Sequence, residues 1–368
     1  MGHYLDYNAT APARPDAVAA VTAALSVPGN PSSVHAAGRT ARALMEDSRD
    51  RVAALTGASP RQVIFTSGGT EAMALALNGF SGRPVLMSAI EHPCAPAAAP
   101  QAERCPVRPD GLLDLDALAA RLADSTRPPP AAVVVMLANN ETGVIQPLTE
   151  VVALAKAHGC AVICDAVQAL GKMPVSFTAL DVDFLVVSGH KIGGPQGIGA
   201  LIARIAEQVP PLMTGGGQER GKRGGTQNLP GIAGFGAAAA AVMAQGPAEQ
   251  IRLARLRDRM EAEVRTMAPA AVIWGENSPR LPNTSCIGLP GVAQQRQVMT
   301  LDLAGIAVSA GSACSSGKLE PSPVLKAMGA SDATAREAIR ISLGWATTEA
   351  DVDAFLRAYA PLAAACTG

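Results

Sequence analysis

Apolar runs of strand length alternate with helix-like stretches through about the first two-thirds of the chain. This alternation predicts helices packed on a mostly parallel sheet, because parallel strands need a long crossover connection between them. The predicted strands are QVIFT (62–66), PVLMSA (84–89), AAVVVML (131–137), CAVICDA (160–166), FLVVS (184–188) and IGALIA (198–203). The predicted helices include residues 71–78, 114–123 and 148–158.

The pattern changes after Pro230. An alanine-rich and then Arg/Glu-rich stretch runs to about Met267 and predicts one or two helices that lead away from the sheet. The remaining sequence mixes short strands (AVIWG, TSCIG and AIRISLG) with helices, which indicates a smaller α+β domain. The sequence therefore predicts a large α/β domain over residues 14–250 and a small domain made of residues 1–13 and 251–368.

Composition narrows the class of protein. Of 368 residues, 48% are hydrophobic and 17% charged, which excludes a disordered chain and allows a large core. The net charge of −1, without blocks of like charge, favours neither nucleic acid nor a membrane surface as partner. The N-terminal MGHYLDYNATAPARP lacks the apolar run of a signal peptide, and GFGAAAAAVMA is too short to span a bilayer.

The cysteines point to a reducing compartment. There are seven, in no regular framework, and an odd number argues against a fully paired secreted scaffold. A cytoplasmic location is therefore expected. Cys160 and Cys164 share one face of a predicted strand, but two thiols cannot complete a zinc site. Both are predicted to be core thiols, and no metal is expected in the resting protein.

The glycine-rich stretch SGHKIGGPQGIG follows the predicted strand at 184–188. Its glycines, at 193, 194, 197 and 199, do not fit the dinucleotide pattern, and no glycine run of the chain has the Walker ending. Lys191 in this stretch lies at the carboxyl end of the strand, where open α/β sheets bind their ligands. Taken alone, a lysine at this position is more simply interpreted as a surface residue.

Three other strand ends favour a ligand-binding role for Lys191 over a place on the surface. VIFTSGGTEAMALALNG is a strand, a tight turn and a helix, so the turn amides and the Thr70 hydroxyl suit a phosphate. Asp165 ends a buried strand, with Gln168 just beyond it, while Asn139 and Asn140 end another. A buried carboxylate needs a cation or donors, and a protonated pyridine nitrogen meets that need. The lysine, the aspartate and the phosphate-binding turn together predict a pyridoxal 5′-phosphate site.

At this point the sequence resembles the cysteine desulfurases, which belong to the fold-type I, class V aminotransferase-like enzymes. The resemblance covers nearly the whole chain, and its last two motifs are typical of desulfurases rather than of transaminases at large. The motifs are YLDYNAT, GNPSSVHAAGR, VIFTSGGTEAMALAL, EHPC, NNETGVIQP, CDAVQALGK, SGHKIGGPQGIGAL, GGGQERGKRGGTQN, GSACSSGKLEPSPVLKAMG and IRISLG.

The resemblance implies a role for each matching residue. Lys191 would hold the cofactor covalently, Asp165 would keep the pyridine nitrogen protonated, and His92 would stack on the ring. Arg340 would grip the substrate carboxylate through its planar fork of donors. Gln168 and Asn140 would contact the ring oxygen and the substrate side. The phosphate would be bound by Gly69, Thr70, Ser188 and His190, and by Thr226 from the second subunit of a dimer. Asn30 and Asn8 would shape the substrate pocket.

Some of these residues have plainer interpretations. His92 could be a helix-entry residue before its proline, Thr226 could cap the following segment, and Arg340 could pair with a surface acid such as Glu337.

Cys314 lies among small residues in VSAGSACSSGKLEP, which is unusual for a buried structural cysteine. The resemblance makes its thiolate the acceptor of sulfur from L-cysteine, so that a persulfide forms and L-alanine leaves. His92 is one candidate for deprotonating a thiol. The acceptor beyond Cys314 would be a protein, for iron–sulfur or other sulfur-containing biosynthesis, and Cys314 could transiently ligate an iron–sulfur cluster.

The sequence also departs from the family. It has NATAPA where paired threonines are frequent, glycine at position 69 where alanine commonly precedes Thr70, and a short tail ending LAAACTG, which puts docking of an iron–sulfur scaffold in doubt. The alternatives are a selenocysteine lyase or another β-eliminating pyridoxal enzyme, a transaminase, and a non-enzymatic sulfur-carrier subunit. The last should have lost Lys191 or Asp165, and both are present.

Overall fold

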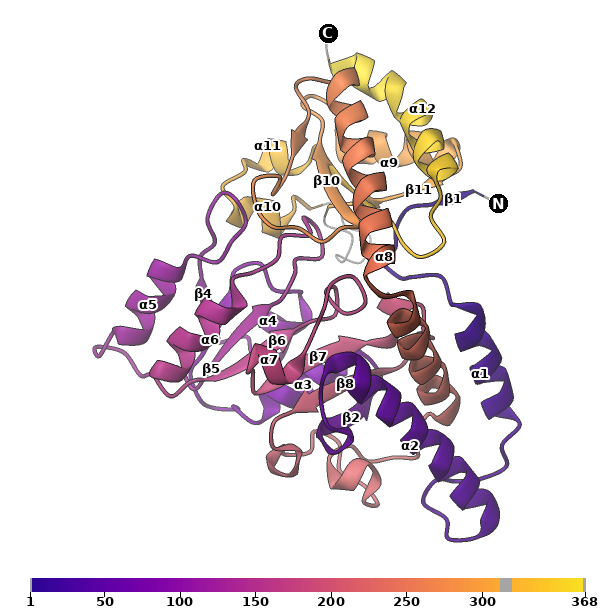
Figure 1. Ribbon diagram of the computed structural model, residues 1–368. Coiled ribbons are helices and arrows are strands. Elements are labelled where there is room, and N and C mark those ends of the chain that lie inside the picture. Colours follow the sequence, from indigo (N-terminus) through magenta and orange to yellow (C-terminus); the bar gives the residue numbers. More distant parts are fainter. Residues whose placement is uncertain (1, 312–319, 367–368) are drawn as a thin grey trace.

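A seven-stranded sheet forms the centre of the larger lobe in the computed structural model, which describes residues 2–311 and 320–366 (Figure 1). β8 pairs antiparallel with β2 and β7, and the other strand pairs of this sheet are parallel. The strand order is β2 (Val63–Thr66), β8 (Gly199–Ala203), β7 (Phe184–Ser188), β6 (Ala161–Asp165), β5 (Ala132–Met136), β3 (Val85–Ser88) and β4 (Glu103–Cys105). The mostly parallel sheet and the six predicted strands are confirmed; β4 was not predicted.

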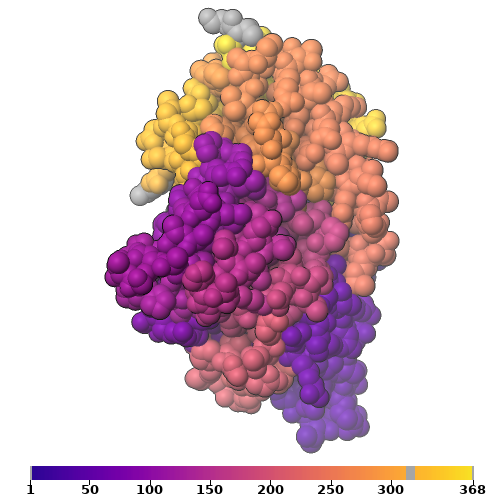
Figure 2. All heavy atoms as spheres, turned by 60° about the vertical axis from the view of Figure 1, so that its left-hand side comes forward, coloured from indigo at the N-terminus to yellow at the C-terminus, as the bar shows by residue number. Residues whose placement is uncertain are grey.

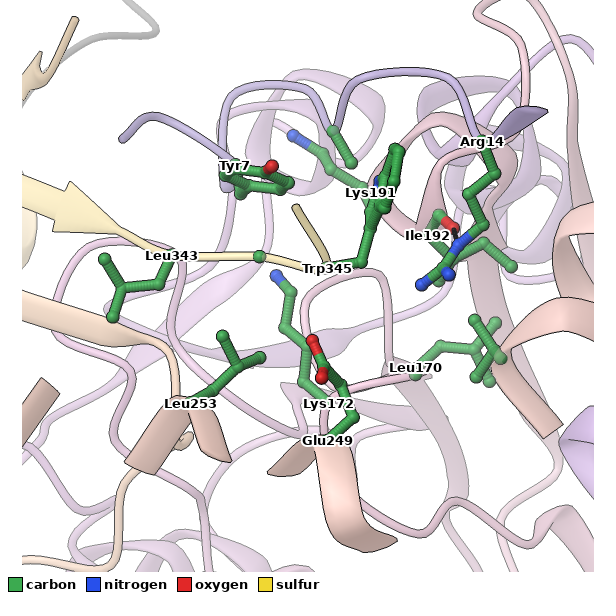
Figure 3. A pocket seen from close by; sticks show the side chains of 14 residues that line it. Tyr7, Arg14, Leu170, Lys172, Lys191, Ile192, Glu249, Leu253, Leu343 and Trp345 are labelled. Carbon is green, nitrogen blue, oxygen red and sulfur yellow. Dashed lines mark hydrogen bonds between the residues drawn. The ribbon is translucent and has the colours of Figure 1, made fainter. Parts of the chain in front are cut away.

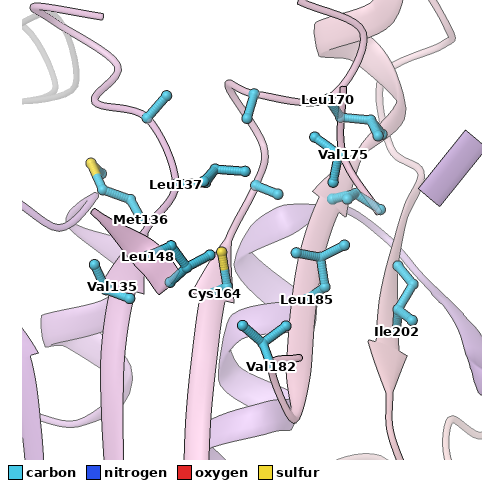
Figure 4. Close-up of a cluster of buried hydrophobic side chains, with 14 of the residues drawn as sticks. Val135, Met136, Leu137, Leu148, Cys164, Leu170, Val175, Val182, Leu185 and Ile202 are labelled. Carbon is cyan, nitrogen blue, oxygen red and sulfur yellow. The ribbon is translucent and has the colours of Figure 1, made fainter. Parts of the chain in front are cut away.

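Alternate residues of the strands pack on opposite faces, because successive side chains of a strand point to opposite sides. One face packs against α3 (Gly69–Asn78), with Met87, Val134 and Ile163 in that cluster. The other face, part of which is shown in Figure 4, holds Val135 and Cys164. It packs against α2 (Ala36–Thr56), α5 (Leu115–Ala123), α6 (Leu148–Ala157) and the first half of α8 (Leu229–Met267). Both faces are therefore covered, which explains why the strands read as continuous apolar runs.

The long helix α8 connects the two lobes. It is broken at Gly246, whose φ of 57° and ψ of −158° are not helical, and Pro247 follows. Before the break α8 packs against α1 (Pro15–Leu25) and α2, and after it Leu253 and Met260 enter the core of the smaller lobe. By length and composition α8 could cross a membrane, but 56% of its apolar window is buried inside the protein, as in the core helix of a globular protein.

The smaller lobe contains an antiparallel sheet and a short parallel pair that ties in the N-terminus. The N-terminal strand lies beside the last third of the chain, as Figure 1 shows by colour. In Figure 2 the orange and yellow atoms of that last third gather at the top of the molecule. The sheet order is β12 (Ser309–Ala310), β13 (Ala338–Ser342), β10 (Thr284–Gly288) and β9 (Val272–Ile273), and the parallel pair is β1 (His3–Tyr4) with β11 (Ile306–Ala307). The helices are α9 (Gln294–Leu303), α10 (Pro323–Ala327), α11 (Asp332–Ala335) and α12 (Glu349–Cys366), while two more short helices, α4 (Cys94–Ala98) and α7 (Phe177–Leu180), belong to the larger lobe.

One apolar cluster of this lobe joins Leu5 to residues between 253 and 363. The first residues of the chain thus share a core with its last third. The division at residues 14–250 stays a prediction.

Candidate active site

A cavity of about 220 Å³ lies at the carboxyl ends of β5, β6 and β7, beside the start of α3. Strand ends of a parallel sheet meet at one edge, so residues far apart in the sequence converge there. The lining residues are Gly69, Thr70, His92, Cys94, Met136, Ala138, Asn140, Asp165, Val167, Gln168, Ser188, His190 and Lys191. The structure thus brings together most of the residues that the sequence singled out.

Asp165 ends β6 and is almost entirely buried. Its Oδ1 accepts a hydrogen bond from the Val167 N–H at 2.9 Å. Burial raises the pKa of Asp165 to about 6, although the Val167 N–H and the Lys191 cation oppose the rise. A cation or a strong donor inside the cavity would therefore be bound favourably by this carboxylate.

Small residues and a helix N-terminus form one wall of the cavity. Gly69 and Thr70 begin α3, whose ten residues direct the positive end of the helix dipole toward the cavity wall. Ser188 and His190 approach from the end of β7. A methyl group at position 69 would lie 3.0 Å from Val167 Cγ2, so glycine relieves a tight contact there. The wall offers backbone and hydroxyl donors to an anion.

Lys191 lies in the short helix η2 (Gly189–Ile192), directly after β7. Its Nζ donates hydrogen bonds to the carbonyl oxygens of Asn8, at 2.5 Å, and Ala9, at 2.8 Å. The same side chain also borders a second, smaller cavity of about 30 Å³ (Figure 3). The N-terminal segment therefore holds the amine at the boundary between the two cavities.

His92 and Cys94 both line the larger cavity. Burial, assisted by the Lys191 cation, lowers the pKa of His92, so its imidazole is neutral at pH 7. The Cys94 N–H donates to His92 Nδ1 at 3.3 Å, and in that tautomer the ring proton is on Nε2. Burial, with Asp165 and Glu91 nearby, raises the pKa of the Cys94 thiol to about 12, so Cys94 is a poor nucleophile.

Arg340 lies on β13 behind Asn140 and does not line the cavity. Its Nη1 donates to the Asn140 carbonyl oxygen at 3.0 Å, and its Nη2 pairs with Asp6 Oδ1 at 2.8 Å. The Nε is buried and has no hydrogen-bond partner in the described part of the chain. The acid that pairs with Arg340 in the described part of the chain is Asp6, not Glu337.

The structure does not bring every singled-out residue to the cavity. Asn8 is buried behind it, and its amide nitrogen donates to the Asn140 carbonyl oxygen at 3.2 Å. Asn30 and Thr226 are exposed and do not line the cavity, and the residue that caps α8 is Asn228 rather than Thr226. Cys314 lies outside the described residues.

Two residues that sequence reasoning did not assign to the site belong to its surroundings: Cys94 and Lys172. Cys94 is part of the quoted EHPC motif, and Lys172 follows Gln168 by four residues in CDAVQALGK, so a short-range signal for both was present. Lys172 Nζ donates to Gln168 Oε1 at 2.6 Å.

The fold and the converging lysine, aspartate and anion-binding wall define a pyridoxal-phosphate enzyme of the α/β type. Comparisons with known proteins agree: residues 3–355 match the family described as aminotransferase class-V. The cysteine desulfurase of Nostoc sp. is 40% identical, covering 95% of this chain and 90% of its own, and that of Cereibacter sphaeroides is 41% identical, covering 98% and 95%. The crystal structure of a NifS-like protein from Rickettsia africae is 34% identical with a TM-score of 0.91, covering 98% and 99%.

The chain belongs to the class-V aminotransferase family and, within it, to the cysteine desulfurases. These are pyridoxal-phosphate-dependent enzymes, and pyridoxal 5′-phosphate is the cofactor of this protein. The residues present fit that group. A buried carboxylate with raised pKa, a lysine amine and an anion-binding wall share one cavity, and together they match the ring nitrogen, the aldehyde and the phosphate.

Proposed function

We propose that the cavity at the ends of β5, β6 and β7 is the site where L-cysteine is desulfurated to L-alanine. The observation that carries this assignment is the convergence of Lys191, Asp165 and the α3 N-terminus on one cavity. When bound, pyridoxal phosphate supplies an electron sink that weakens the bonds at the substrate α-carbon. The protein supplies the anchoring, the proton transfers and the nucleophile.

Lys191 would anchor the cofactor, and its free amine would remove the proton from the substrate α-carbon and pass it on as a general acid. Asp165 would keep the ring nitrogen protonated, because burial raises the pKa of this carboxyl group to about 6 and a cation beside it stabilises its ionised form. Gly69, Thr70, Ser188 and His190 would hold the phosphate, His92 would cover the ring face, and Gln168 would contact the ring oxygen.

Arg340 binds the substrate carboxylate, and Asn140 orients it. The Asp6 carboxylate and the Asn140 carbonyl oxygen hold two of the guanidinium nitrogens, so Arg340 has to turn from these partners to reach a substrate in the cavity. Nε, which has no hydrogen-bond partner among the described residues, is a further donor for a substrate anion. Its buried position makes a missing partner costly, which favours carboxylate binding.

Cys314 takes the sulfur. Its thiolate attacks the substrate sulfur, a new S–S bond forms, and the C–S bond breaks with its electron pair left on the carbon skeleton. Protonation of that skeleton then yields alanine. In the tautomer described above His92 Nε2 already holds a proton, so His92 acts as a base toward a thiol only after its ring proton moves to Nδ1.

A homodimer with shared sites is part of this proposal. Thr226 and Asn30 are both exposed, and a groove of about 300 Å³ is lined by Pro31, Ser32 and Gln227, which adjoin them in sequence. One surface region thus carries both residues, and a second copy could place its own cavity against it. A sulfur-acceptor protein, a cytoplasmic location and small-domain boundaries of 1–13 and 251–368 stay predictions.

The test is to purify the protein, record its visible spectrum and measure sulfide and alanine produced from L-cysteine. A yellow protein, label fixed by borohydride on Lys191 and stoichiometric alanine are expected. Selenocysteine and a keto-acid acceptor, assayed in parallel, separate a selenocysteine lyase or a transaminase from a desulfurase. A colourless protein, or label at Lys172 or Lys222, would contradict the assignment of the site.

A further inference from the structure

Lys172 is a lysine buried beside the candidate active site, 8% exposed, on the turn that follows Gln168. Its Nζ donates to Gln168 Oε1 at 2.6 Å and to Asn8 Oδ1 at 2.9 Å. Figure 3 shows its side chain entering the smaller cavity together with that of Lys191. The two side chains that Lys172 contacts are thus both carboxamides next to the cofactor cavity.

Burial lowers the pKa of Lys172 well below its usual range, and the nearby cations Lys191 and Arg340 lower it further. Among the described residues, the hydrogen-bond partners of Lys172 include no carboxylate. An apolar side chain of the same length would fill this space without the cost of burying an amine. The buried amine therefore stabilises the fold less than an apolar side chain at this position would. Its two amide contacts suggest that it serves the site.

The contact fixes the orientation of the Gln168 carboxamide. Because Oε1 accepts from Lys172, the nitrogen Nε2 lies on the other side, where it donates to the Asn8 carbonyl oxygen at 3.0 Å. An exchange of oxygen and nitrogen would set Oε1 against that carbonyl and Nε2 against an amine donor. Nε2 has a second hydrogen, and Gln168 lines the cavity. Gln168 consequently presents a donor to a ligand rather than an acceptor.

The same amine also holds the segment that contacts the catalytic lysine. Asn8 accepts from Lys172 at its side-chain oxygen and from Lys191 Nζ at its backbone oxygen. A shift of Asn8 would therefore change the hydrogen bonds of both Gln168 and Lys191. The network is closed, since Gln168 also donates to the Asn8 carbonyl oxygen.

We propose that Lys172 is a positioning residue that orients Gln168, so that an amide N–H faces the ring oxygen of the cofactor. The inference rests on the proposed placement of the cofactor over Asp165 and Lys191. Donation to the ring oxygen stabilises its anionic form and so makes the neighbouring Schiff-base nitrogen less basic. Lys172 thereby acts on the cofactor through Gln168.

The experiment titrates the visible band of the resting holoenzyme against pH in the wild type and in Lys172→Met. Methionine nearly matches lysine in volume but offers no donor to Gln168 or Asn8. The midpoint of the titration is expected to rise by roughly one pH unit, a tenfold gain in proton affinity. Gln168→Ala should give a shift of the same sign.

The double variant decides between positioning and a general loss of structure. In the Gln168→Ala background, Lys172→Met should add no further shift, because its effect is transmitted through Gln168. Lys156→Met, at a partly exposed lysine paired with Asp181, is the matched control and should leave the midpoint unchanged. Additive shifts, or a wild-type midpoint in Lys172→Met beside a shifted Gln168→Ala, would overturn the proposal.

Lys172→Gln serves if the methionine variant does not fold. Its amide can still donate over a shorter reach, so its midpoint should fall between wild type and Gln168→Ala, and a wild-type midpoint would count against the proposal. A wild-type protein without a yellow band would instead reject the cofactor placement itself. Failure of the two proposals is therefore distinguishable.

Discussion

Asp165→Asn should stabilise the cofactor-free protein against unfolding at neutral pH, although it should damage the holoenzyme. Burial raises the pKa of Asp165 from 3.8 to about 6, so the folded state holds the proton more tightly than the unfolded chain does. The folded state is therefore favoured at low pH. Stability is lost as pH rises from the unfolded pKa through the folded one, when a buried carboxylate must ionise without a cation beside it.

The size of this cost follows from the shift. A rise from 3.8 to about 6 corresponds to about 3 kcal/mol, since one pKa unit is worth 1.36 kcal/mol. About half of this destabilisation should be present at pH 5, and all of it above about pH 7. Burial also raises the pKa of Glu91 to about 8, so Glu91 adds its own loss of stability with rising pH. Wild type and Asp165→Asn both carry Glu91, so the prediction concerns the difference between the two proteins.

The assay is urea unfolding of cofactor-free wild type and Asp165→Asn at several pH values between 5 and 8. Unfolding is followed by tryptophan fluorescence. The advantage of the variant should grow with pH. Asp181→Asn is the control: that carboxylate is exposed and its pKa is lowered by Lys156 and Arg204, so its removal should not stabilise. A difference between wild type and Asp165→Asn that does not change with pH would refute the reasoning. With cofactor bound the sign should reverse, because the carboxylate then balances the ring nitrogen.

Further expected outcomes concern the nucleophile, the dimer, the substrate and the fold. Cys314→Ser should bind cofactor normally yet release almost no sulfide or alanine, and full activity would exclude Cys314 as the sulfur acceptor. Mixing Lys191→Ala with Thr226→Ala should restore activity through hybrid dimers that have one intact site, and no rescue is expected if each site is complete within one subunit. Arg340→Gln should raise KM for cysteine roughly 10- to 100-fold, because a charge-assisted contact is lost; an unchanged KM would place the carboxylate elsewhere. Glu219→Gln should cost roughly 1–3 kcal/mol of unfolding free energy, since the buried Arg49 guanidinium then keeps only the half-exposed Glu46 as carboxylate partner among the described residues, and an unchanged urea midpoint would contradict this.

The apolar pattern of the sequence is sufficient to predict the central sheet and which residues meet at its edge. Runs such as AVVVM and FLVVS are apolar at every position because both faces of the sheet are covered, so each strand is visible without tertiary information. Asp165 and Lys191 could be assigned to one site because each ends such a strand, and parallel strands end at a common edge. After Pro230 the sequence predicted one or two helices, and the structure has the single helix α8, broken at Gly246 directly before Pro247.

The tertiary structure alone decided how the polar side chains around that centre are paired. Arg340 meets Asp6 across 334 residues and Lys172 meets Asn8 across 164, and no local pattern predicts contacts of such range. Both pairs arise because β1 and the segment after it join the last third of the chain in the smaller lobe and then pass behind the cavity. Burial there, rather than residue type, gives Lys172 its lowered pKa and Asp165 its raised one, since the cost of a charge depends on the water and partners that the fold leaves to it.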